Sequence, residues 1–167
     1  FVKSISDHWS AGLLWDLGSS TRENLNFRTD ILPSIEYDIY PYSEATHRQL
    51  RILYSAGMQI NNYIDSTVYN KMKETLYLQR MNVAFQLQKK WGSINLLLMG
   101  SNYFHDFSKN RIELIGSVRI RIFKGLSLDI NGGVAHINDQ LSLNKGDISE
   151  AERLLQLREL ATKYRVE

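Results

Sequence analysis

Hydrophobic and polar residues alternate one by one through most of this chain. In residues 111–122, isoleucine, leucine and valine dominate the even-numbered positions, while arginine, glutamate and serine are prominent at the odd-numbered ones. Successive side chains of a strand point to opposite faces of a sheet, so this period of two predicts strands with one apolar and one polar face. On this basis strands are predicted at residues 8–17, 27–40, 50–61, 80–88, 111–122 and 126–134.

A few places depart from this simple pattern. Residues 93–104 are ambiguous because four apolar residues, 96–99, are contiguous, and both ends of the chain resemble pieces of further strands. Pro33 lies inside a predicted strand, where it removes a backbone N–H donor, so a β-bulge is expected there. Gly57 and other glycines within strands are interpreted as sites of local twist, with strong sheet curvature or close packing against a partner as the alternative.

The length of the alternating runs favours a membrane over water. Many runs span about 11 to 17 residues, whereas strands of soluble domains usually span about 5 or 6 and a membrane-crossing strand needs about 9 to 11. Two belts of aromatic rings are expected at the water interfaces of a membrane barrel. Aromatic residues lie near both sets of strand ends: Trp9, Tyr40, Tyr42, Trp91 and Phe123 at one, and Trp15, Tyr63, Tyr77, Tyr103 and Phe104 at the other.

Connections between the predicted strands alternate between two classes. Short turns on one rim and long loops on the other are typical of outer-membrane barrels, whose long loops lie outside the cell. We therefore predict an all-β fold, an antiparallel up-and-down transmembrane β-barrel, forming one domain over residues 1–167. About eight strands are visible and further strands are expected beyond both ends. The short connections are residues 6–7, 41–46, 89–92 and 124–125; the others, mostly longer, are residues 18–26, 64–73, 105–109 and 138–163.

One helix is predicted inside the last long loop. Ser149 followed by Glu152 forms a plausible capping box, and leucines and alanines supply an apolar side. This short amphipathic helix would lie on the extracellular rim, either docked on a partner or folded over the mouth of the barrel. Its candidate partner-binding residues are Leu154, Leu155, Leu157 and Leu160.

The two faces of the predicted strands have different chemistry. The charged face would line the barrel interior, where unpaired charges are costly, so we favour an internal network of ion pairs over a pore or ligand site. This set comprises Asp16, Arg28, Asp30, Glu36, Asp38, Arg51, Arg80, Glu113, Arg119, Arg121 and Asp129. The lipid-facing set includes Trp9, Leu13, Ile35, Ile52, Tyr54, Val83, Phe85, Leu114, Val118, Ile120, Leu128 and Ile130.

Composition narrows the classes of function. With 20 basic and 18 acidic residues, the chain lacks the charge excess of a nucleic-acid-binding protein. It has no cysteine, which excludes disulfides, thiolate metal sites and cysteine nucleophiles. No metal-ligand spacing, phosphate loop or glycine-rich nucleotide motif is present, so no metal or cofactor is predicted.

Histidines were considered as parts of a hydrolase site. His8 and His47 lie beside short turns, whereas His105, with Asp106 and Ser108, and His136, with Asn138 and Asp139, lie near the long-loop rim. A hydrolase needs a nucleophile, a base and an orienting group in one place. Such residues are common in polar loops, and we therefore predict no catalytic residues.

Three segments carry a family resemblance: QLRILYSAG (residues 49–57), WGSINLLLMGSNYFHDFSKNRIEL (91–114) and RIFKGLSLDINGG (121–133). They resemble an uncharacterised family of outer-membrane β-barrel proteins of Bacteroidota-type bacteria, and the resemblance covers nearly the whole chain. In that family a leucine- and charge-rich segment also leads to a tyrosine that opens another strand, as ISEAERLLQLRELATKYR does here. The resemblance implies a periplasmic portion before the barrel, at least one more strand after it, and no catalytic residues.

Four functions remain to be separated. The favoured one is a non-enzymatic scaffold or subunit of an envelope complex in the bacterial outer membrane, in contact with lipid and with other envelope proteins at its rims or wall. The alternative is a narrow porin-like channel or transporter with a charged lumen. A surface hydrolase and a soluble lipocalin-like binder are the weaker rivals.

Overall fold

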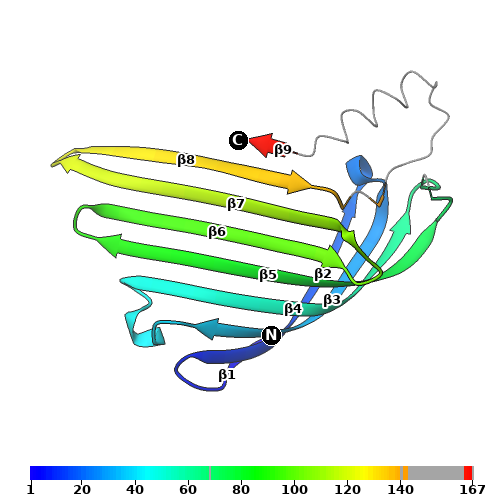
Figure 1. The fold of residues 1–167 in the computed structure, drawn as a ribbon, viewed down its shortest axis with the longest axis horizontal. Coiled ribbons are helices and arrows are strands. Elements are labelled where there is room, and N and C mark those ends of the chain that lie inside the picture. Colours follow the sequence, from blue (N-terminus) through cyan, green and yellow to red (C-terminus); the bar gives the residue numbers. More distant parts are fainter. Residues whose placement is uncertain (68, 140, 143–163, 167) are drawn as a thin grey trace.

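The computed structural model describes residues 1–67, 69–139, 141–142 and 164–166, and most of them belong to one antiparallel sheet (Figure 1). Nine strands follow one another in chain order, each paired with the next. The all-β, up-and-down topology predicted from the sequence is thus confirmed. The strands are β1 (Val2–Ser4), β2 (Trp9–Ser20), β3 (Leu25–Asp38), β4 (Arg48–Tyr63), β5 (Lys73–Lys89), β6 (Gly92–Tyr103), β7 (Asp106–Phe123), β8 (Leu126–Ile137) and β9 (Tyr164–Val166).

Helical structure is limited to two short 3₁₀ turns within the described residues. They are η1 (Thr21–Glu23), between β2 and β3, and η2 (Tyr42–Glu44), between β3 and β4. In the described part of the chain no helix is long and apolar enough to cross a membrane. The amphipathic helix predicted around Leu154 lies outside the described residues.

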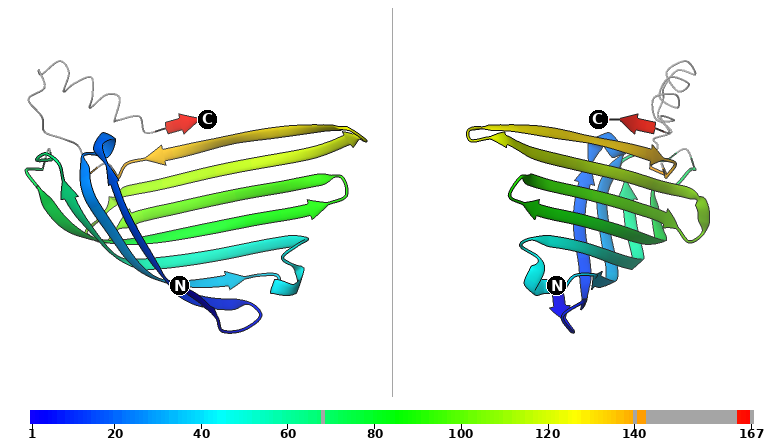
Figure 2. Two further views of the ribbon diagram at one scale, coloured as in Figure 1. Left: turned by 180° about the vertical axis from the view of Figure 1, so that it is seen from behind. Right: turned by 60° about the vertical axis from the view of Figure 1, so that its left-hand side comes forward.

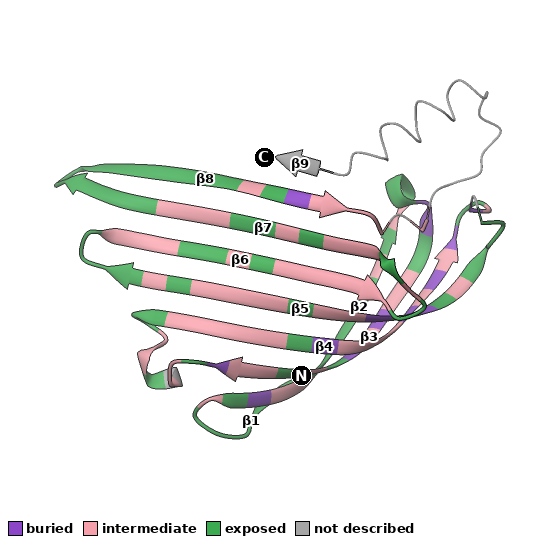
Figure 3. Cartoon of the chain, viewed as in Figure 1, coloured by how far each residue is buried: buried purple, intermediate pink, exposed green. Residues whose placement is uncertain are grey.

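The sheet curls but does not close. Strands β5 to β8 lie side by side in a gently curved layer, while β2 to β4 bend upward at the end that carries η1 (Figures 1 and 2). Most buried residues gather where this bend brings strands over one another (Figure 3). The two edge strands, β1 and β9, are not paired with each other. The predicted barrel is therefore seen as an open, curled wall.

The ambiguous segment is a regular strand. Residues 93–104 fall in β6, which pairs in unbroken register with β5 from Leu78 opposite Tyr103 to Lys89 opposite Gly92. Its contiguous apolar residues divide between the two faces, since Leu97 lies opposite Ala84 and Leu98 lies opposite Val83.

The bulge expected at Pro33 is absent. Pairing between β3 and β4 lapses at Leu32 and Pro33 and resumes in the same register, with Ile31 opposite Met58 and Ser34 opposite Ser55. The missing N–H therefore interrupts the ladder without adding a residue. Gly57 lies across this interruption, and a Cβ atom there would stand 2.1 Å from the Ile31 carbonyl oxygen. At Gly57 the structure therefore shows a close approach between two strands of the same sheet, which neither interpretation from the sequence included.

The predicted contrast between short and long connections is wrong for most of the described chain. On one rim the connections are residues 5–8, 39–47, 90–91 and 124–125; on the other they are residues 21–24, 64–72, 104–105 and 138–163. Strand pairing extends further than the polar composition of residues 18–26 and 105–109 suggested. We call these the turn rim and the loop rim, and only the last connection of the loop rim is much longer than the rest.

Candidate functional site on the two faces of the sheet

Cross-strand register defines the two faces, because paired residues point to the same side of a sheet. We call the two sides of the sheet the inner face and the outer face. Each is defined here by one row of paired residues that runs across strands β2 to β8. The inner row is Ser10, Glu36, Leu53, Asn82, Met99, Glu113 and Ala135. The outer row is Trp9, Tyr37, Ile52, Val83, Leu98, Leu114 and Val134. The inner face lies in the hollow of the curl, where buried Asp30, Leu32 and Ser55 point.

All eleven charged residues of the predicted interior set lie on the inner face. Four of them form a cluster near the loop rim around Asp30, whose side chain is 2% exposed. The Arg80 guanidinium donates to Asp30 at 2.6 Å, and Arg28 lies 3.9 Å from Asp30 and 3.8 Å from Asp16. Two arginines therefore face two carboxylates, which offsets the cost of removing Asp30 from water.

Other charges of the set are paired further along the same face. Arg51 lies 3.5 Å from Glu36, which also accepts a hydrogen bond from the Ser10 hydroxyl at 3.1 Å. Arg119 and Asp129 are 2.5 Å apart on β7 and β8. These pairs join neighbouring strands, so each neutralises charge while holding its strands in register.

Three members of the set lack an ion pair among the described residues. Asp38 is buried and accepts a hydrogen bond from the Gln49 amide at 3.4 Å. Glu113 and Arg121 have no ion pair within the described chain. The inner face thus combines paired charges with three charged side chains that have no ion pair among the described residues, one on β3 and two on β7.

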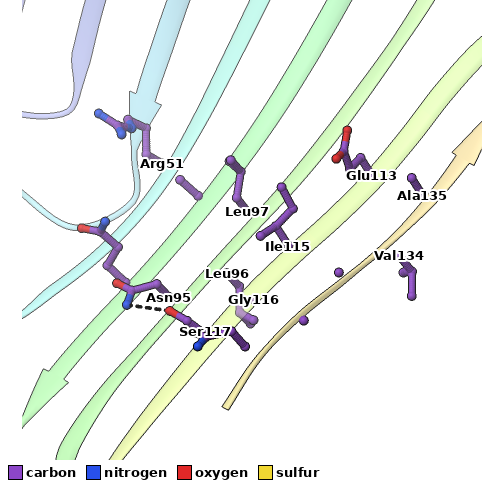
Figure 4. A pocket seen from close by; sticks show the side chains of 15 residues that line it. Arg51, Asn95, Leu96, Leu97, Glu113, Ile115, Gly116, Ser117, Val134 and Ala135 are labelled. Atoms are coloured by element: carbon purple, nitrogen blue, oxygen red, sulfur yellow. Dashed lines mark hydrogen bonds between the residues drawn. The ribbon is translucent and has the colours of Figure 1, made fainter. Parts of the chain in front are cut away.

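A trough of about 550 Å³ lies on the inner face between β4 and β8 (Figure 4). Leu97, Ile115 and Ala135 supply apolar lining, while Arg51 and Glu113 stand toward its borders. Polar side chains line its other part, where the Asn95 amide donates to the Ser117 hydroxyl at 3.2 Å. The inner face is therefore chemically mixed: it carries ion pairs, apolar side chains and neutral hydrogen-bonding groups.

Asn24 forms a clasp at the loop rim that sequence reasoning missed. Its amide nitrogen donates to the carbonyl oxygens of Asp65 (2.9 Å) and Ser142 (3.3 Å), and its amide oxygen accepts from the Asp65 N–H (2.9 Å). The residue is buried and left-handed, with φ of 56°, a conformation that asparagine tolerates better than most residues. Because β2 and β8 lie far apart in the sheet, the contact with Ser142 draws the loop-rim ends of the wall together.

A second contact at this rim also lay outside the predicted set. Arg111 on the inner face of β7 makes a bidentate pair with Asp139, with nitrogen–oxygen distances of 2.9 and 3.1 Å. The same short segment is held by Asn138, whose N–H donates to the Asn110 carbonyl at 2.8 Å. Asn138 and Asp139 are thus tied to β7, and Ser142 is tied to Asn24.

The outer face is apolar and exposed. All twelve residues predicted to face lipid lie on it, and Trp9, Tyr54 and Ile130 are 43%, 41% and 55% exposed. On β4 the apolar positions run from Leu50 to Ile60, bounded by Arg48 and Asn62. Nothing in the described chain covers this face.

Two aromatic residues assigned to the rim belts point inward instead. Tyr63 is buried on the inner face and contacts Asn61 and Glu74 through its hydroxyl. Tyr103 donates to Gln59 at 3.5 Å on the same face. Both residues lie near strand ends, as predicted, but their rings are on the inner side of the sheet.

Among the described residues, the serine and carboxylates near His105 and His136 make contacts with other groups of the loops and strands. The Ser108 hydroxyl donates to Asp106 at 2.6 Å, and the Ser108 N–H donates to the same oxygen at 3.0 Å. These two bonds lower the pKa of Asp106. Asp139 is engaged by Arg111, and His105 stacks near Tyr103 with ring centroids 5.6 Å apart. The serine and the carboxylates therefore have structural partners.

No group of three or more His, Asp or Glu side chains within the described residues is placed to hold a metal ion. Comparisons of the chain with protein-family models, with curated proteins and with solved structures found no match. The resemblance to a Bacteroidota family therefore stays a prediction, and any function must be argued from the two faces themselves.

Proposed function

We propose that this chain forms part of the wall of a transmembrane β-barrel, with its outer face in lipid. The observation that supports this most is the height of the apolar band. Leu50 to Ile60 on β4, and Ile112 to Ile122 on β7, each cover ten steps along a strand. At about 3.4 Å per residue this is about 34 Å, or about 26 Å at a tilt of about 40°, against the about 25 Å expected of barrel walls.

Closure of the wall is part of the proposal. The alternation continues through β8. Leu128 and Ile130 lie on its outer face, while Asp129 and Asn131 lie on its inner face. β9 pairs with β8 only from Val134 to His136, so the backbone of Leu126 to Gly133 on β8 has no partner strand among the described residues on that side. Such an unpaired stretch would be costly in a bilayer unless another strand pairs with it. Strands in addition to those described would complete the ring. A wall of this design is known in the outer membranes of bacteria, which is the location that we propose.

Within such a barrel we propose a structural role, as a scaffold or as a subunit of an envelope complex. This role is supported by the ion pairs around Asp30, with Glu36–Arg51 and Arg119–Asp129. In these pairs the charges of the inner face neutralise one another and stabilise the sheet. The alternative is a narrow channel, supported by the trough beside the unpaired Glu113. Other envelope proteins would contact the rims or the wall.

Planar-bilayer recording separates these two roles. A scaffold predicts no steady conductance from the reconstituted full-length protein, with or without the double change R119Q and R121Q. A channel predicts steps whose cation-to-anion selectivity shifts when these two arginines of the inner face are neutralised. R22Q, at the loop rim in η1, is the matched control and should leave the selectivity unchanged.

Membrane residence itself is tested by extraction and protease protection. The proposal predicts that the protein stays in the membrane fraction at alkaline pH, dissolves only with detergent, and has its strands protected from protease after insertion into phosphatidylcholine vesicles. A monodisperse protein in detergent-free buffer would refute it and favour the lipocalin-like interpretation.

A further inference from the structure

The two rims of the sheet carry different charge. Around the turn rim, side chains on the outer face or in the connections include five cations and two anions: Lys3, Arg48, Lys89, Lys90 and Lys124, against Asp7 and Glu44. Counted in the same way, the described loop rim is balanced: Arg22, Lys71 and Lys73 stand against Glu23, Asp65 and Asp139, and beside the 104–105 connection Lys109 and Asp106 add one charge of each sign. Within the described residues, the excess of positive charge therefore lies at the turn rim.

Most of this charge is free to act on something outside the chain. Arg48 is compensated, since its guanidinium lies 2.5 Å from Glu44 and lowers the pKa of that carboxyl. Lys89, Lys90 and Lys124 are exposed, and none of them makes an ion pair with a described residue. Three uncompensated ammonium groups thus project from the two tight turns of β5–β6 and β7–β8.

Aromatic rings lie near these cations, at the edge of the apolar band that adjoins the turn rim. Trp9 packs against Tyr37 on the outer face, with ring centroids 4.6 Å apart. Trp91 and Phe123, next to the lysines in both turns, are 46% and 62% exposed. Large amphipathic rings flanked by long basic side chains suit the zone where acyl chains meet head groups, because lysine stems lie along apolar surface while the ammonium reaches the phosphate.

We propose that the turn rim binds the phosphate head groups of an anionic phospholipid leaflet, and so fixes the depth and orientation of the wall. The inference rests on the proposed function, since the rim meets a head-group layer only if the outer face is in lipid. Lys89, Lys90 and Lys124 supply the charge, and Trp91 and Phe123 the interfacial anchoring. The balanced loop rim has no comparable preference.

Vesicle titration tests this directly. Full-length protein is titrated with vesicles of phosphatidylcholine alone and of phosphatidylcholine mixed with phosphatidylglycerol, and the partition coefficient is followed by tryptophan fluorescence. Each lysine near an anionic surface is worth about fivefold in partitioning (about 1 kcal/mol). We expect at least a tenfold preference of the wild type for the mixed vesicles, and most of it should disappear in the triple variant K89Q, K90Q and K124Q.

A matched triple variant at the loop rim, R22Q, K73Q and K109Q, removes the same charge and should keep the preference. Added salt should weaken the preference of the wild type, because the charges are exposed. Equal partitioning of the wild type into both vesicles, or equal losses in the two triple variants, would overturn the rim proposal while leaving the wall intact. Failure to insert into either vesicle would instead contradict the proposed function.

Discussion

The substitution V118R distinguishes an outer face that contacts lipid from one that contacts water. Val118 lies on the outer face of β7, in a row with Ile94 and Ile130. The apolar band of β7 runs from Ile112 to Ile122, so Val118 lies next to its centre. In a bilayer V118R should lower the free energy of unfolding by about 2–4 kcal/mol, the cost of a guanidinium near the midplane.

Two controls fix the interpretation of this loss. S117R places the same charge one residue away on the inner face, where the trough leaves room and one hydrogen bond from Asn95 is lost. Its expected cost is about 1 kcal/mol. I122R stays on the outer face but lies at the end of the band, where arginine costs about 0–1 kcal/mol.

The measurement is equilibrium urea unfolding of protein inserted in phosphatidylcholine vesicles, followed by tryptophan fluorescence and extrapolated linearly to zero denaturant. The reasoning predicts that V118R loses far more stability than S117R or I122R. It is refuted if S117R and V118R lose the same amount. It is equally refuted if V118R stays within about 0.5 kcal/mol of the wild type, as an exposed position of a soluble sheet would.

Three further changes probe how the wall is held together, each by the same unfolding measurement. N24A removes the side-chain hydrogen bonds of the clasp and places an alanine in a left-handed conformation, so it should lower the free energy of unfolding by about 2 kcal/mol. N24G also removes the hydrogen bonds, but glycine adopts this conformation easily, so it should cost less. Equal costs would contradict a contribution from the backbone conformation. G57A drives a Cβ atom into a backbone carbonyl oxygen and should destabilise strongly, whereas G18A, with no atom within 4 Å, should be nearly neutral; similar effects would refute the close approach. D30N removes the negative charge that lies 2.6 Å from Arg80 and should cost about 1–3 kcal/mol, discounted because Arg80 is one-third exposed; no loss would show that the ion pair adds no stability.

The alternation of the sequence was enough to predict which residues share a face. Ile112 and Glu113 are adjacent in the chain and point to opposite sides of β7, and the alternation holds along the long strands except at register shifts near their ends, such as that between Arg121 and Phe123. This success has a simple cause: in an extended strand the side of each residue depends only on its number along the strand.

Contacts between residues far apart in the chain could not be predicted from the sequence. Arg80 and Asp30 are 50 residues apart, and their contact follows from the register of two intervening strand pairs. Residues 105–109 look like a polar loop, yet β7 pairs back as far as Asp106 opposite Tyr103. Where pairing stops depends on both strands, so composition alone misjudged the length of that connection. Asn24 gave no more signal than any other polar loop residue.

The central claim is that one face of each strand meets lipid while the other meets water or protein. Because the chain has no cysteine, single cysteines can be introduced along β7 from Ile112 to Ile122 and labelled with a nitroxide in vesicles. The account predicts that accessibility to oxygen peaks at the even-numbered positions with a period of two, while a water-soluble nickel reagent favours the odd-numbered ones. Even-numbered positions that are open to the nickel reagent throughout the band would contradict it.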